Sequence, residues 1–291
     1  MPQLDRRSAQ FHPHIYMHRR CLYIRRGCTK GVSEVASLQA RRAFAALMHI
    51  GLVGWSHLLY AQPPTGRDAP QRSAPSPSDE MAIFISKILA TTEDVWRAKF
   101  REHGSRYEDP KLVLFTDRTQ TACGRGMAAM GPFYCPQDRK IYLDLDFFEE
   151  LNRYGASGDF ARAYVVAHEV GHHVQALLGI EKKVSDTQST ISKLDANRLN
   201  VRLELQADCL AGIWASALGQ LPGITLEPGD IEQGLRATHA LGDDMLQKQE
   251  TGTVVLDSFT HGSGDQRTRW FKRGLETAKI EQCNTFGASE L

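Results

Sequence analysis

The chain has 291 residues, of which 42% are hydrophobic, so it can bury the core of one large domain or two small ones. Its 35 Lys and Arg almost balance its 34 Asp and Glu, which argues against a strongly basic nucleic-acid-binding protein. Ordinary numbers of Gly (24) and Pro (12) exclude collagen-like and wholly disordered classes. We therefore expect a globular protein without a nucleic-acid partner.

The charge is unevenly distributed along the chain. Residues 1–61 hold nine Lys and Arg against two acids, a net charge of +7, and the remaining 230 residues carry a net charge of −6. Residues 1–42 are therefore a basic leader. It precedes an apolar run, 43–61, whose 19 residues are barely enough to cross a bilayer and include two His and two Gly.

The run 43–61 predicts a membrane signal-anchor or the hydrophobic part of a signal peptide with a cleavage position after Ala61. Either interpretation keeps the leader in the cytoplasm and puts the rest of the chain outside. A short amphipathic helix on a soluble protein is the alternative. The length of the leader also makes Met17 an alternative start.

Residues 62–79 contain five Pro and no large apolar side chain, which is typical of an extended linker. The rest, 80–291, is expected to form one compact domain. Apolar periodicity predicts helices at 81–103, 160–178, 194–218, 231–247 and 266–277, and strands at 112–115 and 141–145. These elements predict an α+β domain that is mainly helical with a small β-sheet.

A metal-binding pattern lies inside the second expected helix, 160–178. His168 and His172 are four residues apart on the apolar helix 161–178, so they project from one face and can share one ion. Glu169 between them points about 100° away from His168 and can flank an ion without ligating it. The alternative is a pair of ordinary core or surface histidines.

A second helix carries two carboxylates. Glu204 and Asp208 are four residues apart in the otherwise apolar stretch 203–214, where burying two acids is costly without a cation or hydrogen bonds. Glu204 is therefore the expected third metal ligand, and Asp208 is expected to accept a ring N–H from a ligand histidine. The alternative is a solvent-facing acidic pair beside Arg202 and Lys193.

Two His and one Glu are a ligand set of catalytic zinc, which keeps a fourth position open for water or substrate. Zinc would activate a water, and Glu169 would act as general base and pass the proton to a leaving amine. The tetrahedral oxyanion of the reaction would also need a hydrogen-bond donor. His261, in the glycine-flanked loop 260–264, is the first candidate. Tyr134, His239 and His173 are the others, although His173 should point away from the metal.

Asp243 and Asp244 form one further acidic pair. They could form a second cation site, but a position on a helix surface or a capping role is the simpler expectation.

Several sequence blocks resemble one known family, the neutral zinc metallopeptidases of the bacterial envelope within the gluzincin group. The blocks begin at Thr92, Thr121, Gly131, Tyr142, Ala167, Glu204, Gly242, Phe259 and Cys283 and read TEDVW, TACG, GPFYCP, YLDL, AHEVGHHVQ, ELQADC, GDD, FTHGS and CNTF. The resemblance covers nearly all of 80–291. It implies a zincin-like fold, one zinc ion, a peptide or protein substrate, and a membrane-anchoring segment before the domain.

The resemblance also implies an inner-membrane protein with a periplasmic domain, or a free periplasmic or secreted protein if 43–61 is cleaved. Four cysteines fit an oxidising compartment. A Cys123–Cys135 disulfide would contribute about 3 kcal/mol, and Cys209–Cys283 could form a second pair. Cysteine ligation of a structural metal is the alternative, although the chain has no C-x-x-C.

Two other functions share the same residues. One is a non-catalytic envelope protein in which zinc stabilises a scaffold or binding module. The other is an amidase that acts on cell-wall peptides. The sequence contains no feature that sets the oligomeric state.

Overall fold

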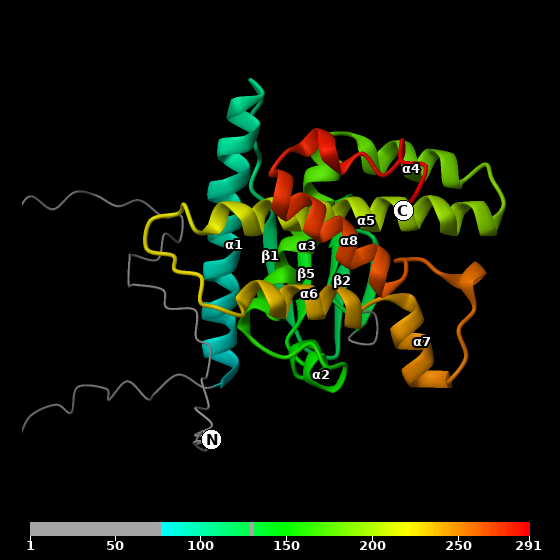
Figure 1. Cartoon of the computed structure of the whole chain (residues 1–291), viewed down its shortest axis with the longest axis horizontal. Coiled ribbons are helices and arrows are strands. Elements are labelled where there is room, and N and C mark those ends of the chain that lie inside the picture. Colours follow the sequence, from blue (N-terminus) through cyan, green and yellow to red (C-terminus); the bar gives the residue numbers. More distant parts are fainter. Residues whose placement is uncertain (1–76, 128–130) are drawn as a thin grey trace, which may run out of the picture. The chain divides into compact units, whose positions relative to one another are not determined.

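The computed structural model describes residues 77–127 and 131–291, where helices predominate over short strands (Figure 1). The leader, the apolar run 43–61 and the linker up to residue 76 lie outside this range. No helix among residues 77–127 and 131–291 is both long and apolar enough to cross a bilayer. The expected mainly helical α+β class is confirmed for this part of the chain.

A small mixed sheet flanks the helices. Strand β1 (Lys111–Phe115) pairs in parallel with β5 (Lys140–Asp144), and β4 (Phe133–Cys135) pairs antiparallel with the other side of β5. A separate hairpin joins β2 (Arg118–Thr121) to β3 (Gly124–Met127). The sequence predicted β1 and β5 but missed the other three, which are only three or four residues long.

Five longer helices build the core: α1 (Pro77–Glu102), α3 (Asp159–Leu177), α5 (Lys193–Leu218), α6 (Asp230–Ala240) and α8 (Gly264–Thr277). Helix α3 is central, since it contacts α1, α5, α6 and β4. Side-chain caps mark two of the starts. The hydroxyl of Ser192 accepts from Asp195 N at 3.2 Å, and Ser263 and Gln266 form a reciprocal capping box.

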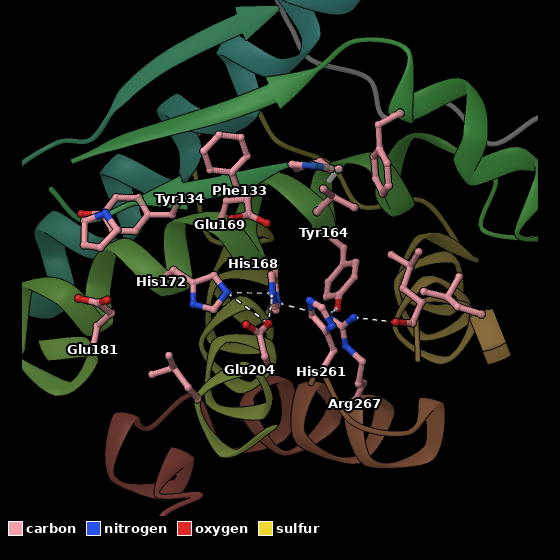
Figure 2. Close-up of a pocket in the computed structure, with 18 residues that line it drawn as sticks. Phe133, Tyr134, Tyr164, His168, Glu169, His172, Glu181, Glu204, His261 and Arg267 are labelled. Carbon is pink, nitrogen blue, oxygen red and sulfur yellow. Dashed lines mark hydrogen bonds and ion pairs between the residues drawn. The ribbon is translucent and has the colours of Figure 1, made fainter. Parts of the chain in front are cut away.

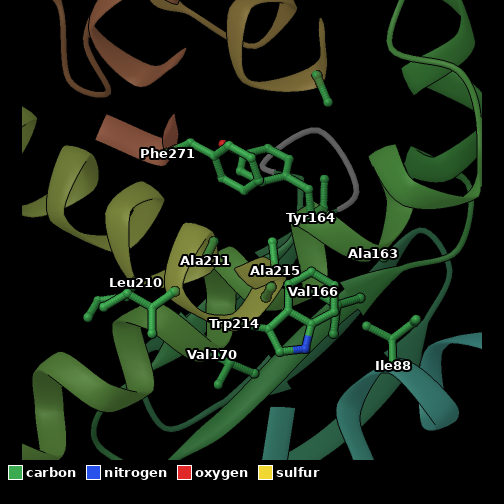
Figure 3. Close-up of a cluster of buried hydrophobic side chains, with 14 of the residues drawn as sticks. Ile88, Ala163, Tyr164, Val166, Val170, Leu210, Ala211, Trp214, Ala215 and Phe271 are labelled. Carbon is green, nitrogen blue, oxygen red and sulfur yellow. The ribbon is translucent and has the colours of Figure 1, made fainter. Parts of the chain in front are cut away.

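Large aromatic side chains fill the space between α1, α3, α5 and α8 (Figure 3). Trp214 of α5 is fully buried, and its ring lies 5.8 Å from that of Phe160. Its indole N–H donates to Thr91 Oγ1 of α1 at 3.0 Å, so the polar atom is satisfied. Each such ring removes 150–250 Å² from water, roughly, which fixes how the helices pack around α3.

The helix expected over 231–247 is wrong as a single element. Helix α6 ends at Ala240, and α7 (Asp243–Thr251) begins after an extended Gly242. A Cβ at Gly242 would lie 2.1 Å from the backbone N of Gly264, so only glycine allows α8 to start this close. Apolar periodicity continues across the break and does not show this contact.

Two further short helices were missed, α2 (Phe147–Arg153) and α4 (Ile180–Gln188). Helix α1 also starts at Pro77, three residues before the expected domain boundary at 80. Proline is favoured at the first position of a helix, so this start is compatible with the Pro-rich composition that predicted a linker.

Both expected disulfides are present. Cys123–Cys135 joins the turn before β3 to the end of β4, with the Cα atoms 5.8 Å apart. Cys209–Cys283 joins α5 to η3 (Ile280–Cys283) near the C-terminus, with the Cα atoms 5.6 Å apart. The first disulfide fixes β4, the strand that leads into the pocket described below. The second fixes α5 against the last segment of the chain.

Candidate metal centre

Three side chains from α3 and α5 bring one nitrogen or oxygen each to a common point (Figure 2). His168 Nε2 lies 3.1 Å and His172 Nε2 lies 3.3 Å from Glu204 Oε2, and the two Nε2 atoms are 3.2 Å apart. All three residues are largely buried, and Glu204 is only 8% exposed. The structure therefore brings together the three residues that the sequence proposed as ligands.

The spacing of these atoms fits a tetrahedral metal ion. Ligand atoms at the zinc bond lengths of about 2.0–2.1 Å lie roughly 3.3 Å from one another in a tetrahedral site. Each histidine also has its second ring nitrogen engaged: His168 Nδ1 donates to Asp208 Oδ1 at 2.8 Å, and His172 Nδ1 donates to Gln175 Oε1 at 2.9 Å. With Nδ1 protonated, the Nε2 lone pair is free to bind a metal.

Gln175 is a site residue that the sequence analysis missed. Its amide nitrogen donates to Leu203 O at 2.7 Å and to Gln206 Oε1 at 3.1 Å, so the amide oxygen must face His172. The side chain is fully buried. Its place three residues after His172 on the same helix was the available signal, because residues i and i+3 are neighbours.

A buried hydrogen-bond network around Asp208 fixes the ring of His168 through its Nδ1 atom. Asp208 Oδ1 accepts from Tyr164 at 2.5 Å and from Arg267 Nη2 at 3.0 Å, and its Oδ2 accepts from Arg267 Nε at 2.9 Å. Arg267 also donates to Leu241 O at 2.8 Å. Nothing in the sequence marked Tyr164 or Arg267, because they reach Asp208 from separate helices. The full burial of Asp208 disposes of the solvent-facing alternative for the acidic pair.

The charged groups of the centre shift one another's pKa values strongly. Burial alone would raise the pKa of Asp208, but Arg267 and His168 lower it to about 2. Burial also disfavours charge on His168, yet Asp208 and Glu204 raise the pKa of His168 to about 10. The nearby histidines hold the pKa of Glu204 well below its usual range despite its burial. The histidines and the carboxylates thus favour one another's charged forms at the point where a cation could bind.

Glu169 faces the pocket from the same turn of α3. It is 6% exposed, and burial raises its pKa even though His172 and His168 act in the opposite direction. The hydrogen bonds found among the described residues include none to its carboxylate, in contrast to Glu204 and Asp208. A buried acid without a donor is costly, so the position suits a group that exchanges a proton with a bound molecule.

Gly171 sets how closely α3 and α5 approach. A Cβ at this position would lie 2.9 Å from Ala207 O and 3.0 Å from Ala207 Cα, which are backbone atoms of α5. The glycine between the two ligand histidines thus lets the helix of Glu204 come near enough to share an ion with them.

His261 lies in the loop before α8 and lines the same pocket. Asp243 holds this loop: its Oδ2 accepts the backbone N–H groups of Thr260 at 2.7 Å, His261 at 2.6 Å and Gly262 at 2.9 Å. Its Oδ1 lies 3.3 Å from His261 Nδ1. The pair Asp243 and Asp244 therefore anchors backbone, since Asp244 Oδ1 accepts from Gly264 N at 2.7 Å.

The other three candidates for the oxyanion donor are placed differently. His173 is fully buried, and its Nε2 donates to Glu108 O at 2.6 Å. Its Nδ1 must then accept a hydrogen bond from the hydroxyl of Tyr134, 3.0 Å away. Tyr134 lines the pocket, but its hydroxyl proton is not available to a bound molecule. His239 lies outside the pocket and pairs with Asp265 at 3.5 Å.

The pocket encloses about 400 Å³ in front of the metal cluster. Besides the residues above, it is lined by apolar side chains from the β4 region, α2, α3, α5, α6 and α7: Pro132, Phe133, Pro136, Phe147, Val165, Leu203, Leu241 and Leu246. Its size and its mixture of apolar walls with a few polar groups are typical of a small-ligand or substrate site.

The chain that carries this cluster matches a known protein family. Residues 37–286 match the model of a family described as "Putative neutral zinc metallopeptidase". The chain belongs to this family. The match confirms the family resemblance of the sequence blocks, and the family name points to zinc as the ion that His168, His172 and Glu204 could hold.

The chain is also similar to proteins from two bacterial species. The chain is 51% identical over 233 residues to the Escherichia coli K12 protein printed as "Uncharacterized protein YpfJ", covering 80% of each chain. It is 43% identical over 195 residues to the Mycobacterium bovis protein "Uncharacterized protein Mb2605", covering 64% of this chain and 65% of the relative. No solved structure matches the chain significantly, so the zincin-like fold stays a prediction.

Proposed function

We propose that this protein is a zinc-dependent peptidase that hydrolyses peptide or protein substrates. The observation that carries the proposal is the position of Glu169, a buried carboxylate that faces the same pocket as the His168, His172 and Glu204 cluster. These three residues would hold one zinc ion. Asp208 and Gln175 would orient the two histidines.

Zinc bound by these residues would supply a Lewis acid that acidifies a water molecule and polarises a carbonyl group. Glu169 then has two tasks. Its carboxylate takes a proton from the attacking water and later gives that proton to the leaving amine. Because burial raises the pKa of Glu169, its protonated form is more accessible than that of an exposed glutamate, which suits a group that must both accept and return a proton.

His261 is the proposed donor to the oxyanion of the tetrahedral intermediate. Its Nδ1 lies 3.0 Å from Thr260 Oγ1 and 3.3 Å from Asp243 Oδ1, which leaves Nε2 as the ring atom available to a substrate. Arg267 also lines the pocket, but four of its five N–H donors are engaged by Asp208, Tyr164 and Leu241. Asp243 would act only through His261, as a positioning residue.

For location, we propose an inner-membrane protein of the bacterial envelope with the peptidase domain in the periplasm, or a free periplasmic or secreted form if 43–61 is cleaved. The basic leader before an apolar run supports the anchor, and the two disulfides fit an oxidising compartment. No nucleic acid is expected as a partner.

The decisive experiment compares the full-length protein with its Glu169→Gln variant. Both are incubated with envelope proteins and cell-wall peptides, and the products are identified by mass spectrometry. We expect peptide-bond cleavage by the parent that a chelator abolishes and zinc restores, and no cleavage by the variant although it still binds one zinc. A variant as active as the parent would disprove the mechanism.

The same experiment separates the alternatives. A scaffold would bind zinc and cleave nothing, and an amidase would act only on the cell-wall peptides.

A further inference from the structure

The pocket has an acidic end. Glu181, in the first turn of α4, lines the pocket on the His172 side of the metal cluster, whereas Tyr164 and Arg267 lie on the opposite side (Figure 2). Tyr134 lines the same end, and it is close enough to Glu181 for the two side chains to interact electrostatically. Neither residue belongs to the proposed metal site or to its hydrogen-bonded supports.

The Glu181 carboxylate has no hydrogen bond or ion pair to any side chain in the described part of the chain. Lys182, the next residue in the chain, and Arg139, which lies near Tyr134, are paired with other acids. Lys182 pairs with Asp186 at 2.7 Å, and Arg139 pairs with Glu108. Consistent with an uncompensated charge, partial burial raises the pKa of Glu181, and the opposing effect of His172 is smaller.

A purely structural role would also place an acid here. Negative charge in the first turn of a helix is stabilising by about 0.3–1 kcal/mol. That role needs only an exposed carboxylate, as with Glu232 in the first turn of α6, which is exposed and outside the pocket. Helix stabilisation therefore does not account for a half-buried Glu181 that lines a cavity.

Tyr134 makes the chemistry of this end more specific. Its hydroxyl proton is donated to His173, so the phenol oxygen can only accept a further hydrogen bond. Its ring face carries partial negative charge. A carboxylate, an accepting phenol and an aromatic ring together favour a cation and disfavour an anion.

Neither Arg267 nor the ligand histidines form an ion pair with Glu181. Arg267 gives four of its five N–H donors to Asp208, Tyr164 and Leu241, and both ligand histidines donate to Asp208 or Gln175. The described part of the pocket thus has an unpaired negative charge at one end and no uncommitted guanidinium for a substrate carboxylate. Recognition of a free C-terminus is not supported by this arrangement.

We propose that Glu181 and Tyr134 form a subsite for a cationic group of the substrate, an ammonium or a guanidinium, on the His172 side of the scissile bond. The inference rests on the proposed peptidase function. The cation can come from a Lys or Arg side chain or from the free amino terminus of the peptide, and both would meet the same carboxylate and ring.

The test uses the full-length zinc-loaded protein and matched decapeptides. One series is blocked at both ends and carries Lys at each position in turn. Its partner series carries norleucine, which has a similar apolar chain but no charge. A third series has norleucine and a free amino terminus. The variants are Glu181→Gln and the control Glu232→Gln, and zinc content confirms that each has folded.

We expect kcat/KM to favour Lys over norleucine about tenfold at one position from the cleaved bond, or a free over an acetylated terminus by a similar factor, as one partly buried ion pair would give. Glu181→Gln should bring that ratio near one, and Glu232→Gln should leave it unchanged. A ratio near one in the parent, or one that Glu181→Gln does not alter, would overturn the subsite.

A binding arm separates this result from failure of the peptidase proposal. The zinc-loaded Glu169→Gln variant, with and without Glu181→Gln, is titrated with the same peptides, and the dissociation constants are compared. If the parent cleaves nothing, the peptidase proposal fails, but a Lys preference in binding that depends on Glu181 still supports the subsite. If the parent cleaves peptides but shows no such preference, the peptidase proposal is supported and the subsite is disproved.

Discussion

The amide oxygen of Gln175 accepts the Nδ1–H of His172 at 2.9 Å, one turn further along the same helix. The amide group cannot be reversed, because its nitrogen donates to Leu203 O and Gln206 Oε1 on α5. Gln175 therefore sets the protonation of one proposed metal ligand, and it joins the two helices that supply all three.

Replacing Gln175 with Ala should weaken zinc binding by about 10–100-fold, the usual effect of losing a hydrogen bond behind a metal ligand. Competition with a chromophoric chelator at fixed pH measures the affinity. The matched control is Gln220→Ala, since Gln220 is exposed in the turn that follows α5 and lies outside the pocket. Equal affinities for the two variants would show that Gln175 does not orient His172.

Gly171→Ala should damage the metal centre without touching a ligand. The added methyl group would lie 2.9 Å from Ala207 O, so α5 must move away from α3 and carry Glu204 with it. We expect a loss of about 1–3 kcal/mol in the free energy of unfolding, as for other overpacked positions, together with lower zinc affinity. Gly219→Ala is the control, because its methyl group meets nothing within 4 Å. Full zinc affinity in Gly171→Ala would contradict the close-approach argument.

The cost of burying Glu169 predicts a pH-dependent stability difference in the metal-free protein. Burial raises the pKa of Glu169 above its ordinary 4.5. Between the ordinary and the raised pKa, the folded state therefore binds more protons than the unfolded state, and stability falls as the pH rises. Glu169→Gln removes the titration. The variant should therefore melt at a higher temperature than the parent near pH 7, and the gap should close below the ordinary pKa of 4.5.

Thermal melts across that pH range measure the gap, with Glu232→Gln as an exposed control. A gap that is constant with pH would mean that the change in stability does not come from ionisation of Glu169.

His261→Ala should lower kcat by about 10²–10³, the usual effect of losing one oxyanion donor, and should leave zinc affinity unchanged. Asp243→Ala should lower kcat as well, because three backbone N–H groups of the loop lose their acceptor. Only the Asp243 variant should also lose stability, by about 1.5–3 kcal/mol. Steady-state kinetics with a cleaved peptide and denaturant titration make the comparison; weaker zinc binding by His261→Ala would point to a ligand instead of a donor.

Local spacing was enough to predict the most specific part of the site. His168, Glu169 and His172 share a helix, and the i, i+4 pair of Glu204 and Asp208 is unusual on an apolar helix, so both patterns are visible within a few residues. The long helices and the class of the fold could also be predicted, because apolar periodicity is likewise a local pattern.

The missed features depend on contacts between distant segments. Arg267 reaches Asp208 across 59 positions and Tyr164 across 103, and nothing near Arg267 in the sequence marks it. Glu181 likewise reads as an ordinary first-turn acid until the pocket is seen. The break at Gly242 arises from its approach to Gly264, which periodicity within 231–247 cannot reveal.

The α5–α8 contact carries a consequence for how sequences in this family can diverge. A Cβ at Gly274 would lie 1.8 Å from the carbonyl oxygen of Cys209, and the sulfur of the same cysteine is bonded to Cys283. One residue of α5, the neighbour of Asp208 in the sequence, is thus held on two sides. We expect Gly274 to be invariant among relatives that keep this helix pair, and any relative with a larger residue there to have rebuilt its metal centre as well.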